Sequence, residues 1–361
     1  MTLSVMQVLH QGGGAGSVTS TLHLSLGLAR AGCRVRFVCP PGSEVEGLAR
    51  AGGLEVYPVP LAQKGRRANA AALAELLDRH PVDLINSQSS KDRAALIWLA
   101  LIGRLRVPLV VTRRQMPRTL PLETWLASRL SSKVVAVSRA VGEALVRRGT
   151  SRAKLVVIPN GLVTDRVDPA VTSAAVEEWR RRIGWEPSRR TIGIVSRPKD
   201  QAIVLRALEQ INIPVRLVLA GVEPASRLGG LAKKVPERHA VVCVPFTPQV
   251  RALYDLLELV LLPSRSEGLS QALLEAMALG KPVVASAATG NLEVITDRVD
   301  GRLVDPLAPP AWARVIEALL SQPAEATRLG SVARHTARVT YSLERTVERT
   351  ADLYRSLIKP S

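Results

Sequence analysis

Two carboxylates stand eight residues apart in the stretch "RSEGLSQALLEAMALGKPVVAS", which runs from Arg265 to Ser286. Glu267 follows a short apolar run that is typical of a strand, and Glu275 lies inside an alanine-rich stretch that is typical of a helix. The first amides of a helix have no internal partner and its dipole is positive there, so such a start can hold a phosphate group. Carboxylates accept hydrogen bonds from paired hydroxyl groups, such as those of a sugar or a ribose.

This spacing is compatible with a nucleotide-sugar site, although the spacing alone favours a plainer interpretation. At about 1.5 Å of rise per residue, the two carboxylates are roughly 12 Å or less apart, which is about the reach from a sugar through a diphosphate to a ribose. The helix start, Gly268, Leu269 and Ser270, would hold the diphosphate, Glu275 would bind the ribose hydroxyls, and Glu267 would fix hydroxyls on the sugar. The bare spacing also fits a helix-start acid and a solvent-facing glutamate with no function.

The elements that must position these residues alternate along the whole chain. Apolar runs separated by helical patterns predict βαβ units and parallel sheets with right-handed crossovers. A polar, turn-rich segment at 162–173 interrupts the alternation, which then begins again. We predict an N-terminal Rossmann-like domain at 1–165 and a C-terminal one at 166–340, with a helix at about 341–361 that can pack back on the first. A cleft between the domains, beside the carboxyl ends of the strands, would bind small ligands.

The composition narrows the classes of partner. The net charge of +18 and the pI of about 10.9 indicate an anionic partner, which could be a nucleic acid, a membrane face or a phosphorylated small molecule. Aromatic residues make up only 3% of the chain, which counts against single-stranded nucleic acid. The three cysteines lack metal-ligand spacing and indicate reduced thiols in a cytosolic protein, with no metal site. We expect no signal peptide and no membrane span.

The segment "YDLLELVLLPSRSEGLSQALLEAMALGKPVVAS" resembles the signature of glycosyltransferase family 4, whose members are retaining sugar-nucleotide transferases of the GT-B fold. The strand, the "PS", the "EG" and the "LLEAMA" helix follow one another in the order of the family's pattern, and the later "GNLEVI" and "DGRLVDP" also match. The resemblance implies an α/β GT-B fold, with two Rossmann-like parallel-sheet domains facing across a cleft. It also implies a UDP- or GDP-linked donor, and catalysis without a metal ion or a bound cofactor.

The N-terminal "QGGGAGS" resembles the glycine loop of the same family. There Gly13, Gly14 and Gly16 would let the backbone approach the donor phosphates closely. A dinucleotide-binding fingerprint is the rival interpretation. It is weak because residue 17 is Ser where the fingerprint needs Gly, and because the second strand ends "VCPPG" without the acid that binds a ribose.

The stretch "IVSRPKD" stands where the family has a Gly-Arg-Leu loop followed by a Lys. The resemblance implies that Arg197 and Lys199 neutralise the diphosphate leaving group, although the loop is a few residues shorter than the family's. Surface cations flanking a strand are the alternative interpretation of this pair.

A second group of cations precedes the midpoint. Six arginines and no acid lie in 93–122, and Arg113 and Arg114 end a strand, so they should face the cleft. We expect these two and His10 to bind the acceptor, although many family members have a His near the position of Arg114. An anionic acceptor would explain the arginines, as would docking of the amphipathic stretch 121–134 on an anionic membrane face. A solvated basic surface remains the plainest alternative.

We therefore predict a retaining, metal-independent glycosyltransferase that moves a sugar from a nucleotide sugar to a glycan or lipid-linked acceptor, in cell-envelope polysaccharide or lipopolysaccharide synthesis. It would be cytoplasmic or peripheral on the inner face of the cytoplasmic membrane. Three alternatives stay open: a GT-B sugar-nucleotide epimerase, a degenerate transferase that only binds its donor, and a basic nucleic-acid-binding protein. The last has no recognisable nucleic-acid-binding element, so we expect no nucleic-acid partner.

Overall fold

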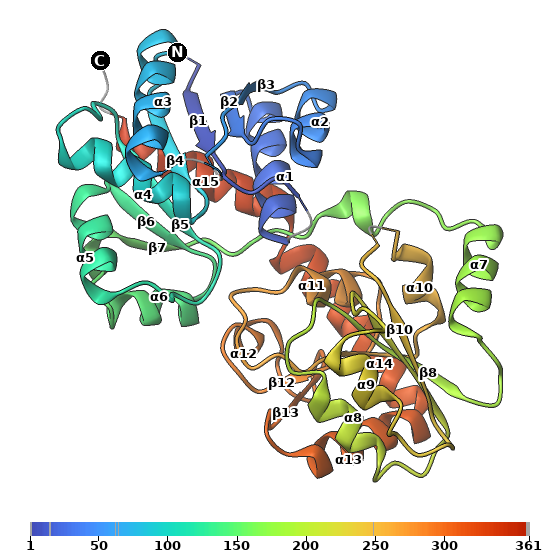
Figure 1. The fold of residues 1–361 in the computed structure, drawn as a ribbon. Helices are drawn as coiled ribbons and strands as arrows, with labels where there is room; N and C mark the ends of the chain where they lie inside the picture. Colours follow the sequence, from blue (N-terminus) through green and yellow to red (C-terminus); the bar gives the residue numbers. More distant parts are fainter. Residues whose placement is uncertain (1, 14–15, 62, 64, 248, 359–361) are drawn as a thin grey trace. The chain divides into compact units, whose positions relative to one another are not determined.

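Both halves of the chain fold around a parallel β-sheet, as the alternation of apolar runs and helical patterns predicts (Figure 1). The computed structural model describes residues 2–13, 16–61, 63, 65–247 and 249–358. The chain divides into two compact units, which are Met1–Gly161 with Ser342–Ser361, and Leu162–Tyr341. The N-terminal unit thus contains the end of the chain, and the C-terminal unit is one continuous segment.

The N-terminal unit alternates strands and helices. In chain order they are β1 (Ser4–Val8), α1 (Gly16–Arg30), β2 (Arg34–Cys39), α2 (Glu44–Ala51), β3 (Glu55–Pro58), α3 (Arg66–Arg79), β4 (Leu84–Ser87), α4 (Ser90–Leu101), β5 (Leu109–Arg113), α5 (Pro121–Leu130), β6 (Lys133–Ala136), α6 (Arg139–Val146), the short 3₁₀ helix η1 (Arg152–Lys154), β7 (Leu155–Val157) and α15 (Leu343–Leu357).

The strand order of this unit reverses at one point, which is where ligands bind in open α/β sheets. Within the described residues its sheet has seven parallel strands in the order β3-β2-β1-β4-β5-β6-β7. The order reverses between β1 and β4. In open α/β sheets, ligands bind at the carboxyl ends of the two strands where this reversal occurs.

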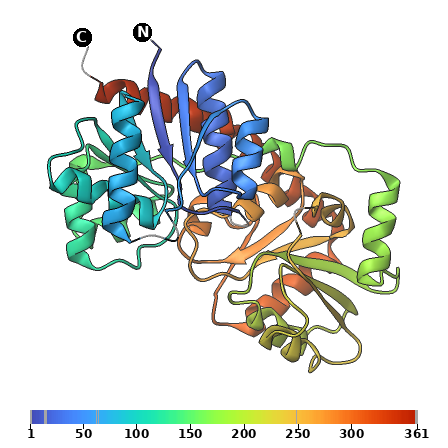
Figure 2. The ribbon, with the colours of Figure 1, turned by 45° about the horizontal axis from the view of Figure 1, so that its top comes forward.

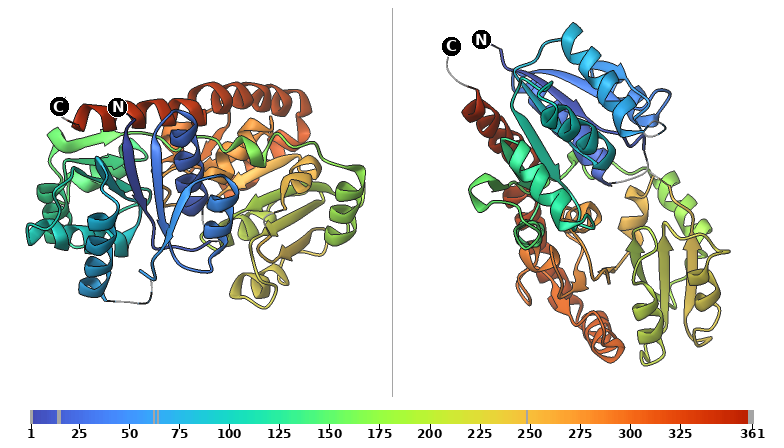
Figure 3. Two further views of the ribbon diagram at one scale, coloured as in Figure 1. Left: turned by 90° about the horizontal axis from the view of Figure 1, so that it is seen from above. Right: turned by 60° about the vertical axis from the view of Figure 1, so that its left-hand side comes forward.

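The last helix, α15, completes the core of the N-terminal unit (Figures 2 and 3). Its Val347, Ala351 and Tyr354 are buried in the same cluster as the apolar residues of β1, β2 and α1. A Cβ atom on Gly27 of α1 would lie 2.4 Å from a methyl group of Val347, so α1 and α15 can pack this closely only because residue 27 has no side chain.

The C-terminal unit repeats the alternation. Its elements are the 3₁₀ helix η2 (Thr164–Arg166), α7 (Ser173–Ile183), β8 (Arg190–Val195), α8 (Ala202–Leu208), β9 (Val215–Ala220), α9 (Arg227–Ala232), β10 (Ala240–Val244), α10 (Arg251–Leu256), β11 (Leu259–Leu262), α11 (Gln271–Ala278), β12 (Val283–Ser286), α12 (Asn291–Val294), β13 (Arg302–Val304), α13 (Pro309–Ser321), α14 (Pro323–His335) and the π-helical turn η3 (Thr336–Thr340).

The second sheet has the strand order of a dinucleotide-binding fold. Its strands run parallel in the order β10-β9-β8-β11-β12-β13 across the described residues, and the order reverses between β8 and β11. The apolar faces of β8, β9 and β11 pack against α8 and α13 around the fully buried Trp312. The alternation predicted from sequence thus produces two Rossmann-like sheets, while a cleft between the two units stays a prediction.

Two further sequence expectations concern thiols and membrane spans. Cys33 and Cys39 are buried and Cys243 is partly buried, and none of the three is in a disulfide within the described residues. Among the described residues, no helix combines the length and the apolar character needed to cross a bilayer.

Candidate active site

The reversal point of the C-terminal sheet carries the residues that the sequence singles out. β8 and β11 are neighbours, and the loops that leave their carboxyl ends hold Arg197 and Lys199 on one side and Glu267 on the other. These loops are 68 residues apart between Lys199 and Glu267, yet the Lys199 Nζ atom forms an ion pair with Glu267 Oε1. The tertiary structure therefore brings together a cation and a carboxylate that sequence reasoning assigned to the same reaction.

A second ion pair joins the same two loops. Arg265 Nε lies 2.8 Å from Asp200 Oδ1, and the backbone amide of Arg265 donates to Asp200 Oδ2 at 2.9 Å. Both partners are neighbours in sequence of the Lys199–Glu267 pair. The β8 loop is thus tied to the β11 loop at two points, which restricts the positions that Lys199 and Glu267 can occupy.

The backbone of Glu267 is held from a third loop, which follows β12. Its amide donates to Thr289 Oγ1 at 2.9 Å, and its carbonyl accepts from the Gly290 amide at 3.2 Å. Thr289 has a φ of 44°, which is uncommon for a residue other than glycine, and local strain of this kind is concentrated at functional sites. A Cβ on Gly290 would lie 1.9 Å from the Gly268 carbonyl oxygen, so this contact requires glycine.

Arg197 differs from Lys199 in having an uncommitted side chain. Its carbonyl oxygen accepts from Gln201 Nε2 at 2.8 Å, which fixes the backbone of the loop. Its guanidinium is exposed and has no hydrogen-bond or ion-pair partner among the described residues. The shortened loop therefore presents one free cation and one paired cation at the end of β8.

The predicted phosphate-binding helix start is also present. α11 begins directly after Ser270, whose hydroxyl accepts from the Leu273 amide at 3.4 Å as an N-cap. Gly268 and Leu269, between Glu267 and this cap, are buried. The positive end of α11 therefore follows the Glu267 loop, as the sequence predicts.

The Glu275 side chain is more buried than we expect of a carboxylate that binds a ribose. Its side chain lies on α11 and the residue is only 3% exposed. Its Oε1 atom lies 2.9 Å from Arg166 Nε, and its Oε2 atom accepts from the Tyr254 hydroxyl at 3.5 Å. Burial raises the pKa of the Glu275 carboxyl, and the Arg166 guanidinium and the Tyr254 hydroxyl oppose that rise. In this conformation Arg166 occupies one oxygen that a ribose would need.

Arg166, Tyr254 and Thr289 complete the site but were not predicted from the sequence. Arg166 lies in η2, more than 100 residues before Glu275, and Tyr254 lies in α10. No motif or spacing marks these residues, because each contact depends on how distant segments pack. The "GNLEVI" match does end the loop that contains Thr289, so the family pattern pointed to the right segment.

The glycine loop of the N-terminal unit packs on the start of α2. The Gly12 carbonyl accepts from the Val45 amide at 3.0 Å, and a Cβ on Gly13 would lie 2.6 Å from Glu44 Oε2. Gly16 begins α1 and is exposed, whereas Gly14 lies outside the described residues. A carboxylate beside Gly13 is unfavourable for phosphate, so binding of the donor phosphates at these glycines stays a prediction.

His10 is oriented by a buried carboxylate at the reversal point of the N-terminal sheet. It follows β1, and its Nδ1 atom lies 3.1 Å from Asp92 Oδ1 at the start of α4, which follows β4. Asp92 is fully buried and accepts from the amides of Gln88 and Ser89 at 2.8 and 2.9 Å. Burial is the largest single influence on the pKa of the Asp92 carboxyl, and it acts to raise that pKa. Hydrogen bonds, with the one from His10 first among them, outweigh burial and leave the pKa below its usual value.

A cavity of about 170 Å³ opens beside His10. Its lining comes from the loop after β1, the start of α4 and the segment after β5, and all of these belong to the N-terminal unit. The described residues of the lining include His10, Arg93, Arg113, Arg114 and Arg118 and no carboxylate. All three residues predicted to bind the acceptor are thus brought to one cavity.

Arg113 and Arg114 are adjacent in sequence, but they have different environments. The Arg114 guanidinium donates to Asn160 Oδ1 and, at 3.0 Å, to Gln88 Oε1. Gln88 continues this buried network through Gln7 to the Tyr354 hydroxyl on α15. The Arg113 side chain has no hydrogen-bond or ion-pair partner among the described residues, although the residue is only 7% exposed.

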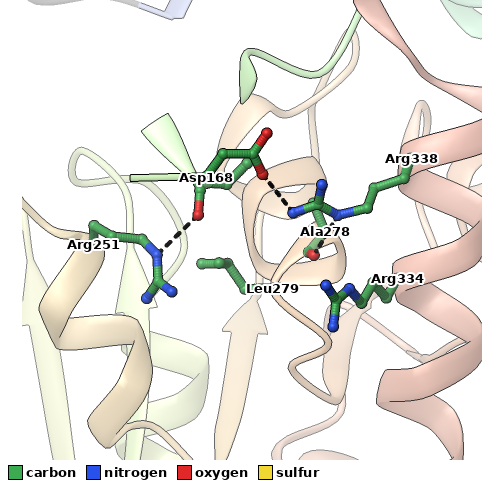
Figure 4. A pocket seen from close by; sticks show the side chains of 7 residues that line it. Asp168, Arg251, Ala278, Leu279, Arg334 and Arg338 are labelled. Atoms are coloured by element: carbon green, nitrogen blue, oxygen red, sulfur yellow. Dashed lines mark hydrogen bonds and ion pairs between the residues drawn. The ribbon is translucent and has the colours of Figure 1, made fainter. Parts of the chain in front are cut away.

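A larger cavity of about 360 Å³ lies at the other end of α11 (Figure 4). Its arginines are mostly engaged with the protein itself. Arg338 donates to the Ala278 carbonyl at 3.1 Å and to Asp168 at 2.7 Å, and Arg251 donates to the Val167 carbonyl at 3.0 Å. Cations are favourable at a helix C-terminus, so this cluster has a structural explanation.

Comparison with known proteins matches both halves of the chain. Residues 14–166 match the family described as Glycosyltransferase Family 4, and residues 176–336 match the family described as Glycosyl transferases group 1. A D-inositol 3-phosphate glycosyltransferase from Xylanimonas cellulosilytica is 34% identical over 221 residues, which is 58% of this chain and 53% of that protein. An alpha-D-kanosaminyltransferase from Streptomyces kanamyceticus is 28% identical over 289 residues, or 73% of this chain and 75% of that protein.

The fold also has solved counterparts. The structure of Anabaena Alr3699/HepE in complex with UDP-glucose superposes with a TM-score of 0.83, covering 98% of this chain and 100% of that one at 21% identity. At that identity the likeness shows the fold alone. The chain spans about half the length of three of the curated relatives it matches, all of them D-inositol 3-phosphate glycosyltransferases (53%, 52% and 48%).

Proposed function

The chain belongs to glycosyltransferase family 4, and from this premise we propose that it transfers a sugar from a nucleotide-sugar donor to an acceptor with retention of anomeric configuration. The observation that carries the proposal is the pairing of Lys199 with Glu267 at the reversal point of the C-terminal sheet, directly before the start of α11. A cation, a carboxylate and a helix N-terminus at one sheet edge are the groups that a sugar diphosphate needs.

In the proposed reaction the protein stabilises the leaving group electrostatically. As the glycosidic bond breaks, negative charge grows on the diphosphate, and Arg197, Lys199 and the start of α11 are placed to offset it. Arg197 is already free, whereas Lys199 must exchange Glu267 for phosphate oxygens. The exchange releases the Glu267 carboxylate to accept hydrogen bonds from hydroxyls of the donor sugar, so diphosphate binding and sugar positioning are coupled.

The nucleoside end of the donor would be bound at Glu275. A carboxylate offers about four acceptor positions, and Arg166 and Tyr254 use two of them. Ribose hydroxyls reach the remaining positions only when the half-exposed Arg166 side chain moves aside. We therefore infer that Arg166 keeps the buried Glu275 charge compensated in the empty site.

We assign acceptor binding to the N-terminal unit, because His10, Arg113 and Arg114 line one cavity there. We propose a glycan or lipid-linked acceptor in envelope polysaccharide synthesis. The support comes from the basic character of the cavity and of the whole chain. Metal independence is part of the proposal and is tested by the reaction in the presence of EDTA.

A donor and acceptor screen tests this function. We expect one UDP- or GDP-sugar to raise the melting temperature, because a ligand at about 100 times its dissociation constant adds about 2.7 kcal/mol of stability. With a suitable acceptor and EDTA present, that donor should release nucleoside diphosphate and form a product whose anomeric configuration, measured by NMR, equals that of the donor. Conversion of the donor without acceptor would identify an epimerase. Tight, steeply salt-dependent binding of DNA without donor binding would favour the nucleic-acid alternative.

We further propose that the protein docks on an anionic membrane face through α5. Leu120, Leu122 and Trp125 are exposed at its start, at 74%, 73% and 50%. A Leu122→Ser/Trp125→Ser double variant should lose most of its flotation with phosphatidylglycerol vesicles. The control Leu307→Ser changes an equally exposed apolar residue of the C-terminal unit and should float like the wild type. Equal flotation of the double variant would refute docking through α5.

A further inference from the structure

Arg113 is a buried cation with no hydrogen-bonded or ion-paired counter-charge among the described residues. It is the last residue of β5, is 7% exposed and lines the cavity beside His10. Its guanidinium carries five N–H groups, and none has a hydrogen-bond partner among the described residues. Burying a charged group without a partner is costly, so such a residue needs another reason to be present.

The surroundings of Arg113 make the cost larger. Arg93, itself 6% exposed, and Arg148 are close enough to repel it, while the attraction of Glu123 is weaker than the effect of burial. Burial, followed by the repulsion of Arg93, lowers the pKa of Arg113 to about 9. The guanidinium thus remains charged at neutral pH, but its positive charge is held at an unfavourable place.

The acids near the cavity are too few to balance its arginines. Asp92 is committed to His10, Ser89 and two backbone amides. Glu123 is half-exposed, and its nearest carboxylate oxygen is 4.0 Å from Arg93. The described lining thus holds four arginines and no carboxylate, and Arg148 adds a further positive charge near Arg113. A phosphomonoester carries a charge of about −1.5 to −2 at neutral pH and would offset part of this positive charge.

The size of the cavity indicates a small group. Its volume of about 170 Å³ is well below the 300 to 1,000 Å³ that is typical of sites for whole ligands. A phosphate group fits such a space, and its oxygens can accept paired hydrogen bonds from a planar guanidinium. The neighbouring hydroxyls of Ser89 and Ser90 belong to the same lining.

We propose that this cavity is a subsite for a phosphomonoester group of the acceptor, with Arg113 as its principal ligand and Arg93 as a second cation. Arg114 has a different task, because its guanidinium is committed to Asn160 and Gln88 and joins β5 to the core network. The proposal extends the transferase function proposed above. It rests on that function only for the statement that the phosphate group belongs to the acceptor. The anion site itself can be tested without any transfer reaction.

Melting temperatures in phosphate-free buffer distinguish the two arginines. Arg113→Met removes a buried charge without removing a bond, so we expect it to melt at a higher temperature than the wild type. Arg114→Met removes two hydrogen bonds from a buried network, so we expect it to melt at a lower temperature. A clear loss of stability in Arg113→Met would show that Arg113 is structural and would overturn the proposal.

Titration with inorganic phosphate tests the site directly. Lys199→Gln is used as the background, because it weakens phosphate binding at the proposed donor site. Phosphate should raise the melting temperature of this background and of its Arg113→Lys derivative, but not of its Arg113→Met derivative. Arg104→Gln, which removes an exposed cation of the same unit, should respond like the background. An equal response of the Arg113→Met derivative would overturn the proposal.

The failure of this proposal and the failure of the transferase proposal are separable. UDP should stabilise Arg113→Met as much as the wild type, because Arg197, Lys199, Glu275 and the start of α11 lie in the other unit and Arg113 is not part of the glycine loop. An Arg113-dependent phosphate response without any response to UDP or GDP would support the subsite and refute the transferase. A normal UDP response without an Arg113-dependent phosphate response would refute the subsite and support the transferase.

The source of the phosphate group is identified by two probes. Glycerol 3-phosphate, compared with glycerol, represents a soluble phosphomonoester, and vesicles with phosphatidic acid, compared with phosphatidylcholine, represent a lipid one. We expect at least a tenfold preference for the phosphorylated member of one pair, and we expect Arg113→Met to abolish it. No preference in either pair would contradict a phosphomonoester ligand.

Discussion

Glu267→Gln should lower the turnover number of the transfer reaction by about 100-fold or more, which is the effect of removing one preorganised group that stabilises a transition state. Glutamine keeps the size and the hydrogen-bonding oxygen of the side chain but not its charge, so sugar hydroxyls lose a charge-assisted partner. The fold should be preserved, because the loop is held by backbone contacts with Thr289 and Gly290 and by the Asp200–Arg265 pair.

The affinity of Glu267→Gln for UDP should not fall with its turnover number. Lys199 no longer has to leave a carboxylate, so UDP should bind Glu267→Gln as tightly as the wild type or more tightly. Calorimetric titration with UDP and steady-state kinetics with the identified donor measure the two quantities separately. Glu237→Gln, which changes an exposed glutamate of the same unit, is the matched control. An unchanged turnover number in Glu267→Gln would remove this residue from the proposed reaction.

Asp92→Asn should destabilise the N-terminal unit by about 3 kcal/mol or more, because removing one partner from a buried charged network leaves the others unsatisfied. Both carboxylate oxygens of Asp92 accept hydrogen bonds from Ser89, and Oδ2 also accepts from Ser87 and Gln88. An asparagine must turn its NH₂ group toward one set of these donors. Asp78→Asn on α3, where the carboxylate is exposed and paired with Arg104, is the control.

The same residue predicts a dependence on pH. The folded pKa of Asp92 is lowered, so its contribution is fully present above the unfolded value of about 3.9 and is lost as the pH falls through the lower folded value. Asp92→Asn should therefore lose less stability than the wild type below about pH 4. Hydrogen exchange of the β4 and α4 amides reports this unit separately from the other. Equal exchange in Asp92→Asn and Asp78→Asn would contradict the assigned role of Asp92.

Much of the fold follows from patterns that are local in the sequence. Apolar runs of strand length and helical repeats of apolar residues predict most elements of both sheets, and Gly32 ends α1 with a φ of 87° as expected of a glycine after a helix. The sequence pattern does not mark α2, α9 or α14 as separate helices. α2 and α9 are short, and α14 follows α13 after a single residue, so the pattern shows no interruption there.

The candidate site was predictable to the extent that motifs mark it. The spacing of Glu267 and Glu275 and the position of the α11 start were apparent from one continuous stretch, and the family pattern added Lys199 and Arg197. The environment of Glu275 was not apparent. Its partner Arg166 comes from the start of the C-terminal unit, and burial by that packing changes an expected ribose ligand into a compensated buried charge.

By itself, the sequence determined the alternation of strands and helices, the two-sheet organisation and the motif that assigns the family, because each of these is encoded in neighbouring residues. Only the tertiary structure decided that Lys199 pairs with Glu267 and that Arg166 contacts the buried Glu275. It alone also decided that Arg113 is buried with no side-chain partner in the described part of the chain, while Arg114 is hydrogen-bonded. The reason is physical. Pairing and burial depend on the order of strands in a sheet, which joins residues far apart in the chain, and neighbouring side chains of the same type can then meet opposite environments.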